Sequence, residues 1–136
     1  MFQVAILDDY TNAALTSSDW DVLPDNYKIT VFNDNLIETD ALVKRLTEFD
    51  IVCAMRERTP FTSEIFNALP NLKLFVTTGM RNAAVDIAAA NKNGVTVCGT
   101  GGSGMSTPEH TWALLHACAR NIVHDSTMMR EGKWQT

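Results

Sequence analysis

The chain has 136 residues, 46% of them hydrophobic and 20% charged, which fits one globular domain with a core of its own. The formal net charge of −5 argues against a nucleic-acid partner, because a nucleic-acid-binding domain presents a basic face. No apolar run reaches the length of a membrane span and the first residues lack the basic start of a signal peptide, so we expect a cytoplasmic protein without a membrane partner.

Short apolar segments alternate with segments of helical periodicity along the chain. The expected strands are residues 2–7, 28–32, 50–55, 72–77 and 95–98. The expected helices are residues 11–20, 39–46, 63–69 and 86–92, followed by one long helix over residues 106–131. This alternation predicts an α/β fold, namely a flavodoxin-like five-stranded parallel sheet with helices on both faces, followed by a long C-terminal crossing helix.

The long C-terminal helix is expected to begin at Ser106, a capping residue, with Pro108 in its first turn and Glu109 three residues after the cap. Its apolar residues cover more than one side of the helix. They are Trp112, Leu114, Leu115, Ala117, Cys118, Ala119 and Ile122. We therefore expect this helix to pack on two partners, one of which can lie outside the chain.

A G-x-G-x-x-G pattern precedes this helix, at Gly99, Gly101 and Gly104. In a dinucleotide-binding fold, such a turn needs a second strand that ends in an acid about 20 residues further on. The expected helix still runs at that distance, so a plain strand-to-helix crossing is the better interpretation of these glycines.

The cysteines and histidines give no metal or redox motif. Cys53, Cys98 and Cys118 stand in apolar segments and are expected to be buried, reduced thiols. None of the three histidines has another metal ligand at helical spacing, and no catalytic triad can be derived from spacing alone. We expect no metal site.

Polar residues follow the expected strands, and ligands bind at the carboxyl ends of the strands in an open parallel sheet. These residues are Asp8, Asp9, Tyr10, Arg56, Thr59 and the turn 78–82. Arg56 and Arg81 could hold a carboxylate with paired donors, and backbone N–H groups of residues 79–82 could form an anion site beside them. Alternatively, the two arginines are solvated and paired with Glu57 or Asp86. The residues alone leave both alternatives open.

A phosphoacceptor receiver domain shares this topology, and Asp8-Asp9 and Thr77 or Thr78 would fit it. The receiver's phosphorylated aspartate belongs after the third strand, where this chain has Met55-Arg56. The receiver's lysine belongs after the fifth strand, where this chain has Gly99-Thr100. Both essential residues are missing.

From about Ile51 onward, short motifs follow one another in a specific order. They are Met55-Arg56-x-x-Thr59, Leu69-Pro70-Asn71-Leu72-Lys73, Gly79, Asp86-Ile87-x-Ala89-Ala90, Asn93-Gly94-Val95-x-Val97, Pro108-Glu109, Ala113-Leu114, Arg120 and Gly132-Lys133-Trp134. Each motif is loose alone, but the ordered series resembles the N-terminal part of the D-isomer-specific 2-hydroxyacid dehydrogenases, the family of phosphoglycerate dehydrogenase.

The resemblance implies that residues 1–104 form the substrate (catalytic) domain. Residues 105–136 would form the interdomain and dimerisation helix and the start of an NAD-binding Rossmann domain. The intact enzyme would be a homodimer that transfers a hydride between NAD (or NADP) and a D-2-hydroxyacid or 2-oxoacid. The catalytic arginine, glutamate and histidine of the family, and most of the cofactor site, would lie beyond Thr136, so this chain alone would be inactive.

The resemblance also assigns binding roles. Arg56 would stand near the substrate, and the backbone N–H groups of Met80 and Arg81, in the turn that begins at Gly79, would hold its carboxylate. The turn 103–107, with Ser103, Met105 and Thr107, would border the nicotinamide ring.

Two departures from the family pattern bear on the substrate. The family usually has Gly-x-Gly with a downstream Asp-Asn where this chain has Gly79-Met80-Arg81-Asn82-Ala83-Ala84, so Arg81 could add a charge to the substrate pocket. It usually has Asn where this chain has Cys98. The alternative function is a stand-alone flavodoxin-like module that binds a small ligand or a protein without catalysis.

Overall fold

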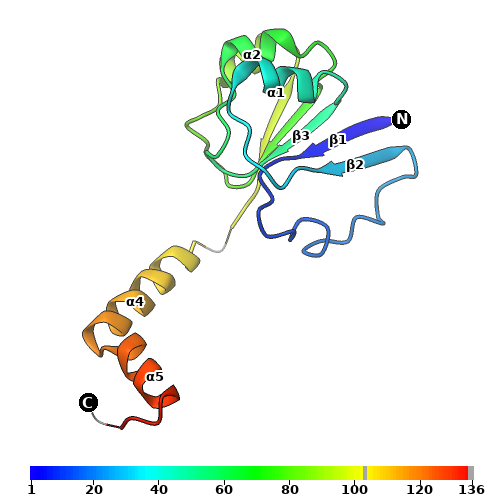
Figure 1. Ribbon diagram of the computed structural model, residues 1–136. Helices are drawn as coiled ribbons and strands as arrows, with labels where there is room; N and C mark the ends of the chain where they lie inside the picture. The colour runs from blue at the N-terminus through cyan, green and yellow to red at the C-terminus, as the bar shows by residue number, and fades with distance from the viewer. Residues whose placement is uncertain (103, 135–136) are drawn as a thin grey trace. The chain divides into compact units, whose positions relative to one another are not determined.

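The computed structural model describes residues 1–102 and 104–134. The chain divides into two compact units, Met1–Gly101 and Gly102–Thr136. The first unit is a parallel sheet with helices, and the second is a pair of helices (Figure 1).

The sheet of the first unit has five parallel strands in the order β2-β1-β3-β4-β5. They are β1 (Phe2–Ile6), β2 (Tyr27–Val31), β3 (Ile51–Ala54), β4 (Leu74–Thr77) and β5 (Thr96–Gly99). This is the expected flavodoxin-like order. Across the sheet, the chain moves from β1 to β2 in one direction and from β2 to β3, β4 and β5 in the other. Because the crossovers are right-handed, the connection from β1 to β2 lies on one face of the sheet and the later connections lie on the opposite face.

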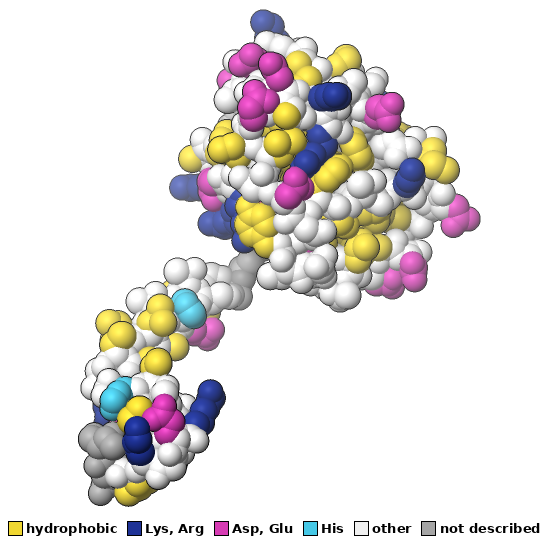
Figure 2. All heavy atoms as spheres, viewed as in Figure 1, with side chains coloured by type: hydrophobic (Ala, Val, Ile, Leu, Met, Phe, Trp, Pro, Cys, Tyr) yellow, Lys and Arg dark blue, Asp and Glu magenta, His cyan; other side chains and the backbone are white. Residues whose placement is uncertain are grey.

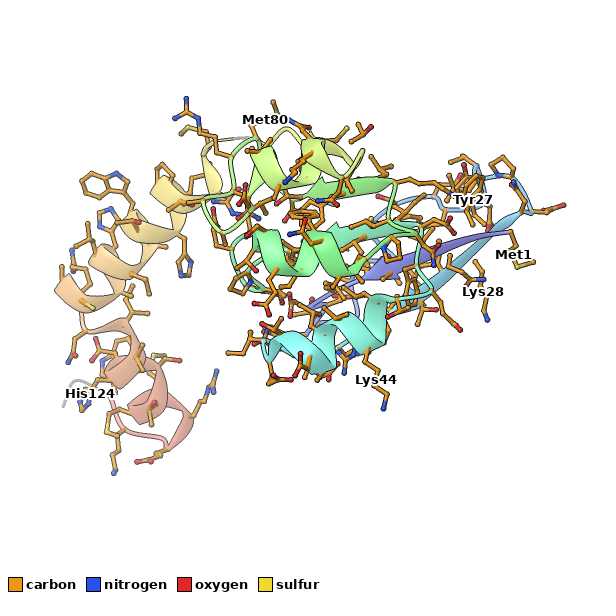
Figure 3. The ribbon with its side chains drawn as sticks, turned by 90° about the horizontal axis from the view of Figure 1, so that it is seen from above. Met1, Tyr27, Lys28, Lys44, Met80 and His124 are labelled. Carbon is orange, nitrogen blue, oxygen red and sulfur yellow. The ribbon has the colours of Figure 1, made fainter. Side chains whose placement is uncertain are left out.

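Three helices connect the later strands: α1 (Thr39–Leu46), α2 (Ser63–Ala68) and α3 (Ile87–Lys92). They lie on one face of the sheet (Figures 1 and 3). The expected helices at residues 39–46, 63–69 and 86–92 are confirmed to within one residue at each end.

The prediction of helices on both faces is wrong, because the connection from β1 to β2 forms turns and no helix. The Asp9 carboxylate accepts the backbone N–H groups of Ala13 and Ala14, at 3.0 and 2.9 Å. The Trp20 indole donates to the carbonyl of Ala14 at 2.8 Å. The amides of Ala14 and Ala13 hold the pKa of Asp9 below its ordinary value, because they stabilise the ionised carboxylate.

The hydrophobic core lies between the sheet and α1–α3. Three phenylalanines form its centre, with ring centroids 4.6 Å apart for Phe61 and Phe75 and 5.8 Å apart for Phe66 and each of the other two. Around them pack buried residues of the strands, of the helices and of the positions next to the strands: Ala5, Leu7, Val52, Ala54, Leu42, Leu46, Ile65, Ala89, Ala90 and Val95. The first unit therefore completes a core from its own residues.

The second unit consists of α4 (Ser106–Ala119) and α5 (Ile122–Arg130). The expected continuous helix is wrong, because the chain breaks at Asn121, whose φ of 53° is left-handed. Asparagine is one of the few residues that adopt this conformation readily. The expected cap is also wrong: Met105 holds the N-cap position and makes no side-chain cap bond, and Ser106 is the first helical residue.

Neither α4 nor α5 has a buried residue. Large apolar side chains of this unit are exposed, including Trp112 at 61% and Val123 at 73%. Hydrophobic atoms are visible on its surface (Figure 2). No helix among the described residues is both long and apolar enough to cross a lipid bilayer.

All three cysteines are free thiols. Cys53, on β3, is half-buried, and burial raises the pKa of its thiol. The prediction of buried cysteines is wrong for Cys98 and Cys118, which are exposed.

Candidate functional site

The carboxyl ends of β3, β4 and β5 lie level with one another. The register pairs Ala54 with Thr77 and Thr77 with Gly99. The segments that follow these strands therefore start side by side, at the end of the sheet away from Met1 and Tyr27. Figure 3 labels Met80 in one of them. We call residues 55–59, 78–82 and Thr100 the strand-end site.

Hydrogen bonds join the three segments of the strand-end site. The backbone N–H of Arg56 donates to the Thr78 hydroxyl at 3.0 Å. The backbone N–H of Gly79 donates to the Thr100 hydroxyl at 2.9 Å. Each threonine thus fixes the backbone of a neighbouring loop, which holds the site in one geometry.

Asn82 also holds these loops together, from a buried position. Its side-chain amide donates to the carbonyl of Arg56 at 2.6 Å and to the Thr77 hydroxyl at 2.9 Å, and its carbonyl accepts the Ala84 N–H at 2.9 Å. The sequence placed Asn82 in the turn but did not reveal this side-chain role. The one available signal is the preference of Asn for turns in which its side chain bonds backbone.

Two glycines allow the loops to approach closely. At Gly79, whose φ is +101°, an added Cβ would lie 2.5 Å from Nη1 of Arg56. At Gly99, an added Cβ would lie 2.7 Å from the carbonyl oxygen of Gly79 and 3.0 Å from Cα of Met80. The guanidinium of Arg56 therefore lies directly against the turn that begins at Gly79.

Two backbone donors of this turn are unused. Among the described residues, the backbone N–H groups of Met80 and Arg81 have no acceptor, and both residues are exposed. An exposed guanidinium beside free backbone N–H groups is suited to bind an anion such as a carboxylate. The structure thus brings Arg56, Gly79, Met80 and Arg81 into one region.

The two arginines differ in their ion pairs. Arg56 has its side chain 61% exposed, and its Nε lies 3.6 Å from the Glu57 carboxylate, so the solvated pair considered from the sequence is present. Arg81 makes no ion pair within the part of the chain that the structure describes. Asp86, its expected alternative partner, caps α3 by accepting the N–H of Ala89.

A cavity of about 540 Å³ opens beside this turn. Arg81 and Met80 line it together with Thr77, Asn82, Ala83, Val85, Ile87, Val97 and Gly99. It therefore combines one cationic side chain with a largely apolar wall.

The expected nicotinamide-binding residues are Ser103, Met105 and Thr107. Ser103 is outside the described residues. Met105 and Thr107 belong to the second unit, where the carbonyl of Thr107 accepts the Thr111 hydroxyl at 2.8 Å.

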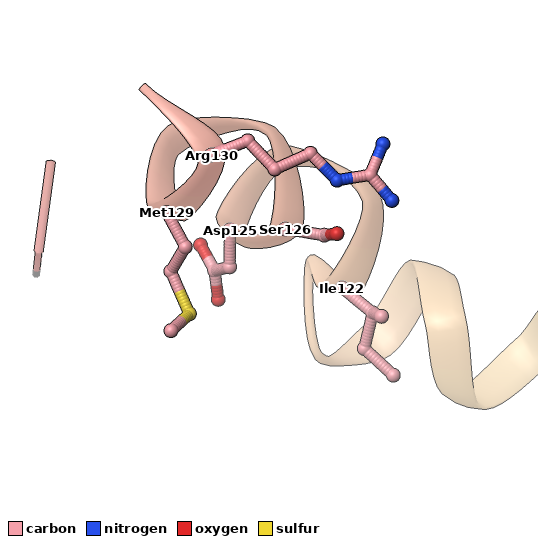
Figure 4. A pocket seen from close by; sticks show the side chains of 5 residues that line it. All are labelled: Ile122, Asp125, Ser126, Met129 and Arg130. Atoms are coloured by element: carbon pink, nitrogen blue, oxygen red, sulfur yellow. The ribbon is translucent and has the colours of Figure 1, made fainter. Parts of the chain in front are cut away.

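The second unit also holds all three histidines of the chain: His110 and His116 on α4, and His124 on α5. The rings of His116 and Trp112 are stacked, 5.8 Å apart. Within the described residues, no three His, Cys, Asp or Glu side chains are grouped to hold a metal. A shallow pocket of about 480 Å³ on α5 has Asp125 and Arg130 among its lining residues (Figure 4).

The fold and the strand-end site define an α/β domain with a guanidinium and two free backbone N–H groups at the carboxyl end of a parallel sheet. Residues 4–129 match the family described as D-isomer specific 2-hydroxyacid dehydrogenase, catalytic domain. The chain therefore belongs to the D-isomer-specific 2-hydroxyacid dehydrogenase family.

Among similar proteins, the chain is 31% identical over 127 residues to hydroxypyruvate reductase of Thermotoga maritima, with 93% of this chain and 41% of that protein covered. It is 32% identical over 97 residues to D-3-phosphoglycerate dehydrogenase of Archaeoglobus fulgidus, with 71% and 18% covered. A crystal structure of phosphoglycerate oxidoreductase from Vibrio cholerae o395 superimposes with a TM-score of 0.84 and 34% identity, covering 100% of this chain and 43% of that one. The chain thus spans well under half the length of these relatives.

Proposed function

We propose that this chain is the substrate-binding part of an oxidoreductase that transfers a hydride between NAD(H) and a D-2-hydroxyacid or its 2-oxoacid. The observation that carries the proposal is the guanidinium of Arg56 lying against Gly79, beside the unused N–H groups of Met80 and Arg81. These donors bind the substrate carboxylate. The family membership favours this function over a stand-alone binding module.

In this proposal the carboxylate is fixed from two sides. The two backbone donors have no side-chain freedom to lose, and the guanidinium adds a charge-assisted bond. Fixing one end of a small 2-oxoacid in this way sets the position of its C2 carbon, and such positioning lowers the barrier to a reaction at that carbon. The side chain of Arg81, which belongs to the same turn, adds positive charge to the site.

The remaining parts of the reaction are assigned to residues that follow this chain in the complete protein. From the family resemblance, we assign the NAD-binding domain and the catalytic arginine, glutamate and histidine to that following part. Residues 1–104 are then the substrate domain, and residues 105–136 lead into the second domain. Ser103, Met105 and Thr107 lie beside the nicotinamide in this proposal. The cofactor is NAD or NADP, the protein is cytoplasmic, and this chain alone does not turn over.

A homodimer through the α4–α5 region accounts for the exposed apolar side chains of the second unit. They include Trp112, Leu114, Leu115, Ile122 and Val123, each more than half exposed. An interface is the usual role of a surface so rich in large apolar groups.

The reaction is tested by following NADH and NADPH oxidation with the complete protein and a panel of 2-oxoacids that includes glyoxylate, pyruvate, hydroxypyruvate and phosphohydroxypyruvate. We expect reduction of at least one of them to the D-hydroxyacid. The matched amide of that substrate, which lacks the carboxylate charge, should be reduced at least about 10-fold less efficiently, because it cannot make the charged bond to Arg56. A protein of 15.0 kDa in its native cells that reduces no 2-oxoacid would instead be the stand-alone module.

A further inference from the structure

Asp8 is a buried carboxylate that the proposed substrate site does not use. It directly follows Leu7 after the end of β1, is 1% exposed and has a left-handed φ of 59°. A buried carboxylate is costly unless hydrogen bonds satisfy it. Both of its oxygens are satisfied: Asn35 Nδ2 donates to Oδ1 and the Thr59 hydroxyl donates to Oδ2, each at 2.8 Å.

These bonds join three segments that are far apart in the sequence. Asn35 follows β2, and Thr59 follows β3. Arg58 adds a further connection, because its Nη1 donates to the backbone carbonyl of Asp8 at 2.6 Å while its guanidinium stacks 4.4 Å from the Tyr10 ring centroid. The segment 58–59 is therefore held to the end of β1 through both a side chain and a backbone group of Asp8.

Arg56 stands at the other end of the same short turn. Its φ of 54° is a left-handed conformation that few residues other than glycine adopt and that persists only when the surroundings fix it. Its backbone N–H is bound by Thr78 and its carbonyl by Asn82. These contacts hold the start of the turn, and the Asp8–Thr59 bond holds its end.

We propose that Asp8 and Thr59 are positioning residues of the substrate site: their buried hydrogen bond fixes the turn 56–59 and so keeps the Arg56 guanidinium against Gly79. They touch no substrate and act only through the turn. This inference rests on the proposed role of Arg56 in binding the substrate carboxylate.

The test replaces Thr59 in the complete protein with valine, which has the same shape but no hydroxyl, and with serine, which keeps the hydroxyl. Ile65→Val serves as the control, because Ile65 is buried in α2 and makes no bond to the turn. Three quantities are measured: the backbone hydrogen exchange of residues 55–61, and KM and kcat for the 2-oxoacid that the wild type reduces.

Thr59→Val is expected to exchange about 10-fold faster in this segment, because local opening no longer breaks a buried bond. Its KM is expected to rise about 10-fold with kcat within about threefold, while Thr59→Ser and Ile65→Val stay near wild type. Exchange and KM unchanged in Thr59→Val, or changed equally in Ile65→Val, would overturn the inference. If the wild type reduces no 2-oxoacid, the proposed function fails, and faster exchange confined to residues 55–61 still supports the positioning of the turn.

Discussion

The two units of this chain differ in the exposure of their large apolar side chains. The first unit buries its large aromatic side chains, with Phe61 and Phe75 fully enclosed between the sheet and α1–α3. The second unit leaves Trp112 61% exposed and Leu115 54% exposed, and buries no residue of α4 or α5. A unit with a complete core is stable by itself, whereas a pair of helices with exposed large apolar groups gains stability by covering them. The difference separates a unit that buries a core of its own from a pair of helices whose large apolar groups are uncovered.

The largest expected effect is on the core of the first unit. Phe75→Ala removes the ring that contacts both Phe61 and Phe66. We expect this substitution to lower the free energy of unfolding by about 3–5 kcal/mol, the usual cost of truncating a buried phenylalanine to alanine. Chemical denaturation of the chain measures this change.

Trp112→Ala provides the matched comparison, since it truncates an aromatic residue of the second unit. It should shift the unfolding of the first unit by less than about 0.5 kcal/mol. Similar losses for Phe75→Ala and Trp112→Ala would mean that the two units do not differ in the way described here.

The second largest expected effect is on the association of two copies of the complete protein. In the complete protein, Trp112→Ala should raise the Kd of the dimer about 30-fold, the effect of losing an interface residue worth about 2 kcal/mol. Analytical ultracentrifugation over a range of concentrations gives this Kd. Glu109→Ala, a polar residue exposed on the same helix, is the control and should leave the Kd within about threefold. A monomeric wild type, or equal Kd values for both variants, would contradict a dimer interface on α4.

The smallest expected effect is on the pH dependence of the free energy of unfolding. It concerns Asp50, which lies at the opposite end of the sheet from the strand-end site. The Lys73 ammonium, at 2.6 Å from Asp50 Oδ1, and the backbone N–H of Gln3, at 2.9 Å from Oδ2, lower the pKa of Asp50 from its ordinary value of 3.8. Because the pKa is lower in the folded state, the stabilisation is complete above pH 3.8 and is lost as the pH falls through the folded-state value.

Asp50→Asn should therefore cost about 1 kcal/mol at pH 7, the combined value of an ion pair to an exposed lysine and one hydrogen bond. The difference from wild type should shrink as the pH falls below 3.8 and through the lowered folded-state pKa of Asp50, where the wild-type carboxylate becomes protonated. Urea denaturation between pH 2.5 and 7 follows it. A difference that stays constant over this range would show that the charge of Asp50 contributes nothing.

The sequence predicted the sheet well, because short β-branched strands and helices with one apolar face leave a clear periodicity. It did not predict the break at Asn121, since asparagine is compatible with both a helix and a left-handed turn. It also predicted a helix for residues 11–20, where the bonds of Asp9 and Trp20 form turns instead. Pattern analysis shows which residues are apolar but not which backbone groups a polar side chain will bind.

Part of the candidate site could also be predicted from the sequence. Arg56 and the turn at Gly79 could be identified because they follow adjacent parallel strands, whose carboxyl ends must meet. Asp8 and Asp9 are both buried, and the sequence could not assign them different roles, because they are identical in type and stand side by side. Asp8 binds Asn35 and Thr59, whereas Asp9 binds the backbone of residues 13 and 14. Only the three-dimensional contacts separate them.

The central claim is that Arg56 binds the substrate carboxylate, and the most direct measurement compares kcat/KM of Arg56→Gln with wild type in the complete protein. The control is Arg45→Gln, because Arg45 makes a surface pair with Asp34 at 2.7 Å and lies on α1. We expect Arg56→Gln to lower kcat/KM for the 2-oxoacid about 10- to 100-fold, the effect of losing one charged hydrogen bond, and Arg45→Gln to leave it within about twofold. Equal kcat/KM values for Arg56→Gln and wild type would contradict the account.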